Sequence, residues 1–383
     1  MISKQPQLSD FISTSSSLPE LSISPPLLNS ANPWATTEED LVALYKCPYT
    51  GAVTVRTSLF QAFSQNASTH QYTFFSSSLG HATTKINVDG GEGRGEIVPG
   101  ETSSLNTLGY SPIAFERYIL MLVRLSRTPE FHSMTKQRDG KLKPFIVSVT
   151  GSAEEVGRCC EHLLEVLNEP EKSYPVATEF QSPSSGSGEG LDLMIEINLS
   201  CPNIPDKPPP AYDGASLSEY ITAVGEAKAR VPKTYSRGLH VGVKTPPYTY
   251  QGQFQILIDA LERSSGLEDG CPISFISATN TLGSCLVLDE KNDAALGSVN
   301  RSGIGGLAGD ALHFIALGNV KTIWGLLDAS KYEDVRKIKI IGIGGVRDAA
   351  GYKRMMKVGA SAVGVGTALG REGVAVFEKI ARG

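Results

Sequence analysis

The chain has 383 residues, 40% of them hydrophobic, so it is long enough to bury a large core. A net charge of −5 gives no reason to expect nucleic acid as a partner, and no apolar run reaches the roughly 18 residues that would predict a membrane span. Six cysteines are too few for a disulfide-based fold of this length, which favours a reducing, cytoplasmic location.

Residues 1–24 are rich in Ser and Pro and are expected to form a flexible arm before a folded part that spans residues 25–383. Short apolar runs then alternate with helical patterns, the first of which follows Thr37, an expected N-cap with acidic residues after it. Strands that alternate with helices indicate an α/β protein with a parallel sheet, and eight such units fit a TIM (β/α)8 barrel; a doubly wound open sheet is the alternative. The predicted strands are 26–30, 51–57, 145–151, 192–200, 238–245, 272–280, 339–345 and 361–368.

Three longer segments interrupt this alternation: residues 60–112, 169–190 and 281–310. The first and third follow strands, so they are expected to be long βα-loop insertions at the barrel end that carries active sites. The segment 169–190 precedes a strand and is therefore expected at the opposite end, away from catalysis.

The most informative stretch is Ile-Asn-Leu-Ser-Cys-Pro-Asn at 197–203, which follows the apolar residues of a predicted strand. It delivers two carboxamides and a thiol to one constrained loop. Carboxamides offer paired donors and acceptors to flat polar rings, and a thiol with a suitable pKa acts as a base or nucleophile. The stretch predicts an active site that contains Asn198, Cys201 and Asn203.

Glycine clusters end the last two predicted strands, at 342–345 and 364–367. Glycine lets a backbone approach a ligand closely, and in barrels the loops after the last two strands often bind phosphate. The clusters therefore favour a cofactor that carries a phosphate, with tight turns as the alternative. A Rossmann site is excluded, because no Gly-x-Gly-x-x-Gly motif follows an N-terminal strand.

Lys244 ends a buried strand in VGVKTPPY, and two prolines fix the loop after it. We expect it to place a cation beside the cofactor, where it would stabilise developing negative charge; the alternative is a lysine that extends from the barrel end into solvent. Asn106 and Asn280 also lie at or near predicted strand ends. His162 and His240 show no metal-ligand spacing and are interpreted as structural, as are the cysteines other than Cys201.

Several motifs together carry a family resemblance. They are NLSCPN with the following KPPPAYD, then VGVKTPPY, NTLG at 280–283, GIGG at 303–306, IIGIGG and VGVGTALGREG. In this order they resemble the class 1 dihydroorotate dehydrogenases, and most closely the cytosolic, fumarate-linked subclass. The resemblance runs from about Pro25 to Gly383. It implies FMN as cofactor, dihydroorotate and orotate as substrate and product, fumarate as electron acceptor, and a homodimer without a membrane or nucleic-acid partner.

The resemblance also implies roles for individual residues. Cys201 resembles the active-site base and Lys244 the lysine beside the flavin. Residues that resemble the substrate contacts are Arg56, Asn106, Leu108, Gly109, Tyr110, Asn198, Asn203, Asn280 and Thr281. Residues that resemble the flavin contacts are Ser30, Ala31, Arg56, Thr57, Asn198, Lys244, Gly305, Gly344, Gly345, Gly366 and Thr367.

Arg56 departs from the family pattern, which has a lysine at this strand end. A guanidinium is planar and bulkier than an ammonium, so the exchange is not neutral. A paralogous FMN oxidoreductase that acts on a different unsaturated or pyrimidine-like substrate is therefore the alternative function. A non-catalytic barrel that keeps flavin as a structural ligand is a second alternative, and the presence of Cys201 and Lys244 disfavours it.

Overall fold

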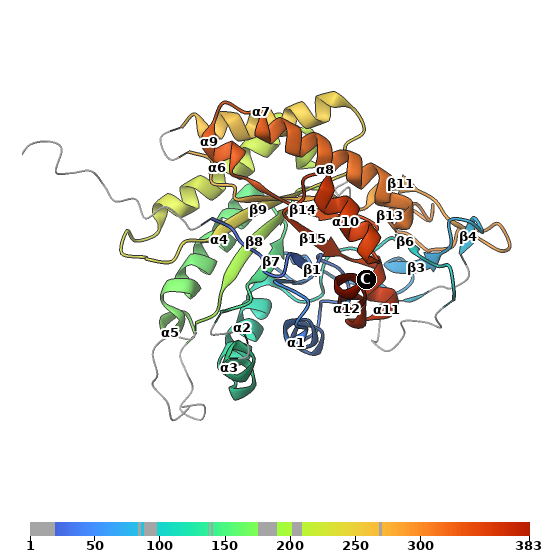
Figure 1. The fold of residues 1–383 in the computed structure, drawn as a ribbon, viewed down its shortest axis with the longest axis horizontal. Helices are drawn as coiled ribbons and strands as arrows, with labels where there is room; N and C mark the ends of the chain where they lie inside the picture. The colour runs from blue at the N-terminus through green and yellow to red at the C-terminus, as the bar shows by residue number, and fades with distance from the viewer. Residues whose placement is uncertain are drawn as a thin grey trace, which may run out of the picture.

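Eight parallel strands form the centre of the molecule in the computed structural model (Figure 1), which describes residues 20–82, 86–87, 98–136, 138, 141–174, 190–200, 209–267 and 270–383. The strands follow one another in the order β1-β15-β14-β10-β9-β8-β7-β2, and a parallel bridge between Leu28 and Ala52 joins the two end strands. The sheet is thus a closed barrel, as predicted, and the open-sheet alternative is wrong. Its strands are β1 (Leu27–Asn29), β2 (Val53–Thr54), β7 (Phe145–Val149), β8 (Leu193–Asn198), β9 (His240–Thr245), β10 (Phe275–Ala278), β14 (Lys339–Ile343) and β15 (Ala362–Val365).

Helices surround this barrel (Figure 1). Thr37 caps the first helix, as predicted, because its side chain accepts from the Asp40 N–H while the Asp40 carboxylate accepts from the Thr37 N–H. The helices are α1 (Glu38–Lys46), α2 (Phe115–Ser126), α3 (Pro129–Lys136), α4 (Ala153–Asn168), α5 (Pro170–Ser173), α6 (Gly214–Arg230), α7 (Gln251–Ser265), α8 (His313–Asp328), α9 (Glu333–Arg336), α10 (Ala349–Lys357), α11 (Thr367–Glu372) and α12 (Ala375–Arg382). Among the helices described, none is long and apolar enough to cross a membrane.

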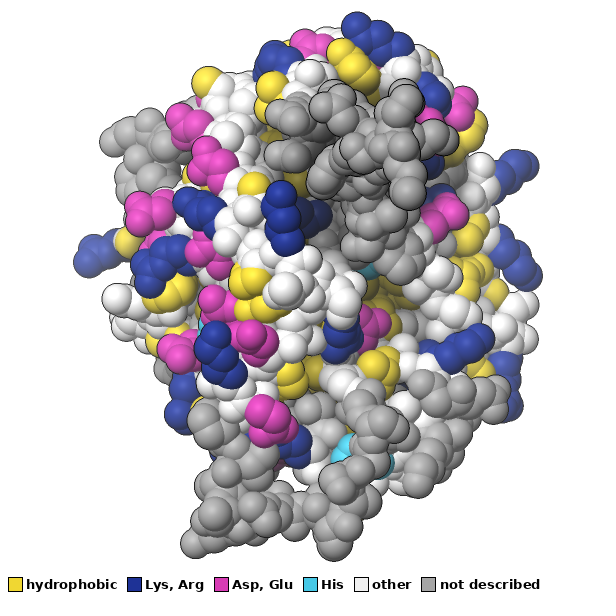
Figure 2. Space-filling view, turned by 90° about the vertical axis from the view of Figure 1, so that its left-hand side faces the viewer, with side chains coloured by type: hydrophobic (Ala, Val, Ile, Leu, Met, Phe, Trp, Pro, Cys, Tyr) yellow, Lys and Arg dark blue, Asp and Glu magenta, His cyan; other side chains and the backbone are white. Residues whose placement is uncertain are grey.

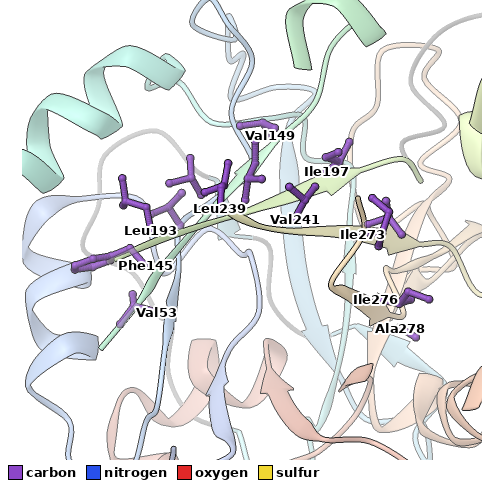
Figure 3. Close-up of a cluster of buried hydrophobic side chains, with 14 of the residues drawn as sticks. Val53, Phe145, Val149, Leu193, Ile197, Leu239, Val241, Ile273, Ile276 and Ala278 are labelled. Carbon is purple, nitrogen blue, oxygen red and sulfur yellow. The ribbon is translucent and has the colours of Figure 1, made fainter. Parts of the chain in front are cut away.

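The barrel strands are buried on both faces, which explains their nearly continuous apolar sequences. One face packs under the helices, and Figure 3 shows part of this layer, with side chains such as Phe145, Leu193 and Val241. The alternate residues point into the barrel. Apolar inward residues form a separate floor cluster, most of which lies towards the N-terminal ends of the strands, although Ile343 ends β14. The cluster is made of Leu28, Ala52, Ile146, Met194, Phe275, Ile341, Ile343 and Ala362.

The inward residues above this floor are polar. Ser148 of β7 and Glu196 of β8 are direct neighbours across the two strands, and Asn198 of β8 is the neighbour of Lys244 of β9. Ser277 of β10 is in turn the neighbour of Lys244. The period-2 alternation of the strands therefore creates a polar layer near the C-terminal end of the barrel, below the expected active site.

The two βα insertions form a second sheet, which the sequence did not predict. It has the order β11-β13-β6-β3-β4-β12, with β5 paired to β3, and Figure 1 shows it beside the barrel. Its strands are β3 (Gln71–Phe75), β4 (His81–Ala82), β5 (Ile86–Asn87), β6 (Ser103–Asn106), β11 (Leu282–Cys285), β12 (Leu288–Asp289) and β13 (Gly305–Gly309). Segments 60–112 and 281–310 are thus paired with each other, and this sheet extends the C-terminal end of the barrel.

Polar and aromatic contacts join this sheet to the barrel. The hydroxyls of Ser104 and Thr367 lie 2.9 Å apart. The guanidinium of Arg371 lies 3.2 Å from the Glu101 carboxylate and 4.7 Å from the centre of the Phe74 ring, and Arg371 and Glu101 are both buried. The sheet is therefore a fixed part of the site's wall.

The last residues of the predicted N-terminal arm contact the barrel. Residues 1–19 lie outside the described part, but Leu21 and Ile23 pack against the floor cluster of the barrel, and Glu20 pairs with Lys339. Residues 20–24 therefore belong to the folded part. On the face shown in Figure 2, the described basic and acidic side chains are intermixed, in line with the small net charge.

Candidate active site

Three of the predicted site residues meet at the C-terminal ends of neighbouring strands. Asn198 ends β8, Lys244 lies at the end of β9, and Asn280 follows β10. The Asn280 carboxamide donates to Asn198 Oδ1 at 3.1 Å, and its backbone N–H donates to Thr245 O at 2.8 Å. Cys201 and Asn203 lie outside the described residues, so their roles stay predictions; Cys201 follows Asn198 by three residues in the sequence.

A one-directional chain of hydrogen bonds runs from these amides into the polar layer. Asn198 Nδ2 donates to Thr57 Oγ1 at 3.3 Å, and the hydroxyls of Thr57 and Ser148 lie 2.9 Å apart. Ser148 donates to Glu196 Oε1 at 2.8 Å, so its only proton is committed and it must accept from Thr57. The Glu196 carboxylate therefore determines the orientation of the Ser148 and Thr57 hydroxyls and, through them, of the Asn198 amide.

Lys244 ends the polar layer as a buried cation. Only 3% of the residue is exposed, which contradicts the alternative of a lysine that extends into solvent. Among the described residues, its charged partner is Glu196, whose Oε1 lies 3.9 Å from the ammonium. This distance is beyond a hydrogen bond, so the ammonium has capacity to bind a ligand atom.

Buried hydroxyls near Lys244 also lack partners among the described residues. They are Ser277 Oγ and Thr279 Oγ1, which lie on and just after the strand next to Lys244. Buried polar atoms are normally hydrogen-bonded, and unpaired ones point to a missing ligand or water. Together with the ammonium, they fit the polar edge of a flavin ring, which offers both acceptors and donors.

The glycine clusters lie together, as predicted for a phosphate site. Strand β15 is hydrogen-bonded to both β1 and β14, so Ser30, Gly344 and Gly366 follow three neighbouring strands. Gly344 and Gly345 have φ angles of 143° and 70°, which L side chains rarely adopt. A Cβ on Gly366 would lie 3.0 Å from Ser30 Oγ, so the Gly366 backbone lies close to the Ser30 hydroxyl. Ala31, the next residue after Ser30, is partly exposed at the same end.

Gly305 is not brought to this cluster. It begins β13, where an added Cβ would overlap the backbone of Asn106. It is Gly309, at the other end of that strand, whose carbonyl lies 2.6 Å from the Cβ position of Gly345. Gly305 therefore lies with the expected substrate residues Asn106 and Thr281, since Gly306 beside it approaches the Thr281 hydroxyl.

The sequence did not identify His313, whose imidazole hydrogen-bonds to the backbone at Gly344. Its Nε2 lies 3.1 Å from Arg354 Nε, a donor, so Nε2 accepts and Nδ1 carries the proton. Nδ1 then donates to Gly344 O at 2.8 Å. The histidine is buried and lies at the start of α8, and an isolated histidine in a helix sequence gives no signal of such a contact.

The loop 107–111 carries three predicted substrate contacts, and this substrate loop is fixed on both sides. Ser111 donates its backbone N–H to Thr57 O at 2.8 Å, and its hydroxyl lies 2.8 Å from the Tyr118 hydroxyl. Within the loop, the Leu108 N–H donates to Asn106 Oδ1 at 3.3 Å. Gly109 has no room for a side chain, because a Cβ would overlap the Phe63 ring.

Arg56 reaches this loop from the end of β2. Its Nη2 donates to Gly109 O at 3.3 Å, and only 5% of the residue is exposed. Burial lowers the pKa of the guanidinium to about 10, and the Tyr118 hydroxyl partly opposes this shift. At neutral pH the side chain is charged and close to the predicted substrate loop.

The histidines and the adjacent cysteines interpreted as structural lie in helix α4 and strand β9. His162 lies in α4 and His240 begins β9, and burial lowers the pKa of His240 to about 4. Cys159 and Cys160 are buried in α4 without disulfides, and burial raises the pKa of Cys160 to about 12. Across the described part of the chain, no cluster of His, Cys, Asp and Glu could hold a metal ion.

The geometry defines a (β/α)8-barrel site with a buried cation, two hydrogen-bonded carboxamides and a glycine cluster. Comparison with known proteins adds a family. The family model for dihydroorotate dehydrogenase matches residues 189–383. "Dihydroorotate dehydrogenase (fumarate)" of Saccharomyces bayanus is 30% identical over 266 residues, which are 65% of this chain and 77% of that protein. The enzyme of the same name from Saccharomyces cerevisiae is 30% identical over 264 residues, 64% of this chain and 76% of that one.

A Streptococcus agalactiae protein assigned as dihydroorotate dehydrogenase A (fumarate) is 32% identical over 222 residues, which are 58% of this chain and 61% of the relative. The chain belongs to the dihydroorotate dehydrogenase family. This membership confirms the predicted resemblance and implies a flavin cofactor, and the identities near 30% mark a divergent member.

Proposed function

We propose that the chain oxidises dihydroorotate to orotate in pyrimidine synthesis, with FMN as the cofactor and fumarate as the electron acceptor. It is an oxidoreductase that acts on a CH–CH donor, like the relatives whose names state this activity. The observation that carries the proposal is the buried Lys244 ammonium with the Asn198 and Asn280 amides, at the same barrel end as a glycine cluster that suits a single phosphate.

One group of residues would bind the cofactor. Ser30, Gly344, Gly345, Gly366 and Thr367 would hold the phosphate end of FMN, and Lys244 would contact the polar edge of its ring. FMN, when bound, supplies the acceptor for the hydride that leaves C6 of dihydroorotate.

The substrate would lie between the two loops. Asn106, Asn198, Asn203 and Asn280 would orient the pyrimidine ring, while Arg56 and the Leu108–Tyr110 segment would hold its carboxylate. Cys201 would take the proton from C5. A thiol near its ordinary pKa of about 8.5 is mostly protonated at neutral pH, so activity should rise with pH.

An anaerobic titration tests the reaction. Purified protein should be yellow with FMN, dihydroorotate should bleach the flavin absorbance, and fumarate should restore it with one succinate formed per orotate. Cys201→Ala should keep FMN but reduce the rate of bleaching by about 10²-fold or more. Colourless protein that FMN cannot reconstitute, or an Ala variant as fast as wild type, would contradict these assignments.

Arg56 favours one second candidate, a paralogous FMN oxidoreductase for another unsaturated or pyrimidine-like substrate. Its fixed fork of donors suits a ligand with a carboxylate or paired carbonyls at that edge. Under this alternative, dihydroorotate would be a poor substrate and Arg56→Lys would improve its turnover. Efficient turnover of dihydroorotate by the wild type would reject it. We also propose a homodimer in the cytoplasm, which light scattering and cell fractionation would test.

A further inference from the structure

The guanidinium of Arg56 is a buried cation held by neutral acceptors. One is Gly109 O, at 3.3 Å from Nη2. The other is the side chain of Gln65. With its carboxamide oxygen turned towards Arg56, Gln65 accepts from Nη1 at 3.2 Å and from Nη2 at 2.8 Å. The opposite orientation would place two sets of N–H groups face to face, so the hydrogen bonds decide the assignment.

No carboxylate pairs with Arg56 among the described residues. A buried charge is normally paired, because removing it from water is costly unless an opposite charge or several hydrogen bonds compensate. Three of the five guanidinium donors are engaged, by Gly109 and twice by Gln65, which leaves two for a ligand. These two, on Nε and Nη1, point away from each other, so a ligand carboxylate would accept from one of them and supply the missing negative charge.

The loop that carries Gln65 is anchored to the substrate loop. The Phe63 N–H donates to Ser111 O at 3.2 Å, and the Phe63 ring packs edge to face on Tyr110 with 5.9 Å between ring centres. The same ring covers Gly109, which has no room for a Cβ. Gln65 follows two residues later, so its position relative to Arg56 is fixed by this packing.

We propose that Gln65 is a positioning and specificity-determining residue, which orients Arg56 towards the substrate loop while leaving its charge free for a substrate carboxylate. A glutamate at position 65 would orient Arg56 equally well but neutralise it. The neutral amide therefore selects carboxylate-bearing ligands over uncharged ones. This inference rests on the proposed function, since it assigns the carboxylate partner within that site.

The test uses the FMN-loaded enzyme and the perturbation of flavin absorbance by ligands. Orotate and uracil form a matched pair, because uracil is orotate without the carboxylate. Gln65→Glu should weaken orotate binding by about ten- to a hundredfold, the loss of one charge-assisted interaction, and change uracil binding by less than about twofold. Gln61→Glu is the control, because Gln61 is exposed on the same loop and receives the same charge.

Gln65→Leu serves as a second variant if the glutamate variant does not fold. It removes the acceptor without adding charge and should also lower the orotate-to-uracil selectivity. An equal loss for both ligands would show a merely structural role, and unchanged selectivity would overturn the inference. If wild type binds no orotate, the proposed function fails, and fumarate against its uncharged diamide becomes the ligand pair. A selective loss of fumarate would then keep the inference, and binding of neither would reject it.

Discussion

Replacing Ser148 by alanine should disconnect the site amides from the buried carboxylate. Ser148 is fully buried, donates to Glu196 Oε1 at 2.8 Å and accepts from Thr57 at 2.9 Å. A hydrogen bond to a charged group contributes about 1.5–3 kcal/mol and a neutral one about 0.5–1.5 kcal/mol. Ser148→Ala should therefore lower the free energy of unfolding by about 2–4 kcal/mol.

Ser277 offers a matched control in the same polar layer. It is also fully buried and points into the barrel from β10, but its hydroxyl has no partner among the described residues. Ser277→Ala removes the same atom without breaking a bond, so its effect on the free energy of unfolding should stay within about 0.5 kcal/mol. Urea denaturation of the two apo variants gives the comparison directly, provided that their m-values agree.

The same exchange should affect the site. Without Ser148, the Thr57 hydroxyl is free to rotate and no longer fixes the Asn198 amide, so the FMN-loaded variant should bind orotate more weakly and be reduced more slowly by dihydroorotate. Equal destabilisation by the two alanine variants, or normal orotate binding by Ser148→Ala, would refute the idea of a directed chain.

Three further predictions concern stability. Lys143→Met should cost at least about 2 kcal/mol in urea unfolding, because the buried ammonium donates to Tyr45 O at 2.6 Å and Cys47 O at 2.7 Å, and these carbonyls would be left unpaired. Gly242→Ala should cost about 1–3 kcal/mol, because its Cβ would overlap the Phe275 ring in the barrel floor, and Phe275→Leu should relieve part of this cost. Burial, followed by the nearby charge of Lys228, lowers the pKa of His240 to about 4. The unfolded chain therefore binds more protons below about pH 6.5, stability should fall from there towards pH 4, and His240→Asn should flatten this slope in unfolding measured across that range.

The barrel could be predicted from the sequence because its signal is local. Each barrel strand, such as 145–149, is a short apolar run buried on both faces, and helical patterns separate most of the runs. The second sheet has no such signal. Strand β6 pairs with β13, which follows it by about two hundred residues, so Leu105 lies opposite Leu307 only through tertiary structure. Pairing between segments so far apart produces no regular spacing of apolar residues in either segment, so the sequence did not predict it.

The site shows the same division. Asn198, Lys244 and Asn280 could be found because they end strands, where side chains meet at one edge of the barrel. Ser148 and Glu196 lie inside apolar runs and were not singled out, although the sequence contained a signal: a polar residue at an inward position of a buried strand requires a partner. Gln65 lies in an insertion, and its contact with Arg56 depends on the packing of that loop.

Residues that stabilise the fold and residues of the candidate site therefore lie at different levels along the barrel axis. The apolar floor, with residues such as Met194 and Phe275, gains free energy from burial, whereas the layer that contains Glu196 and Lys244 loses it, because desolvation of two charges 3.9 Å apart is only partly repaid. The fold tolerates the cost of this polar layer because the apolar floor and the contacts between strands and helices stabilise it. Substitutions in the floor should consequently change the free energy of unfolding while leaving ligand selectivity intact. Substitutions in the polar layer should change both, since its hydrogen bonds continue into the amides that we propose as substrate contacts.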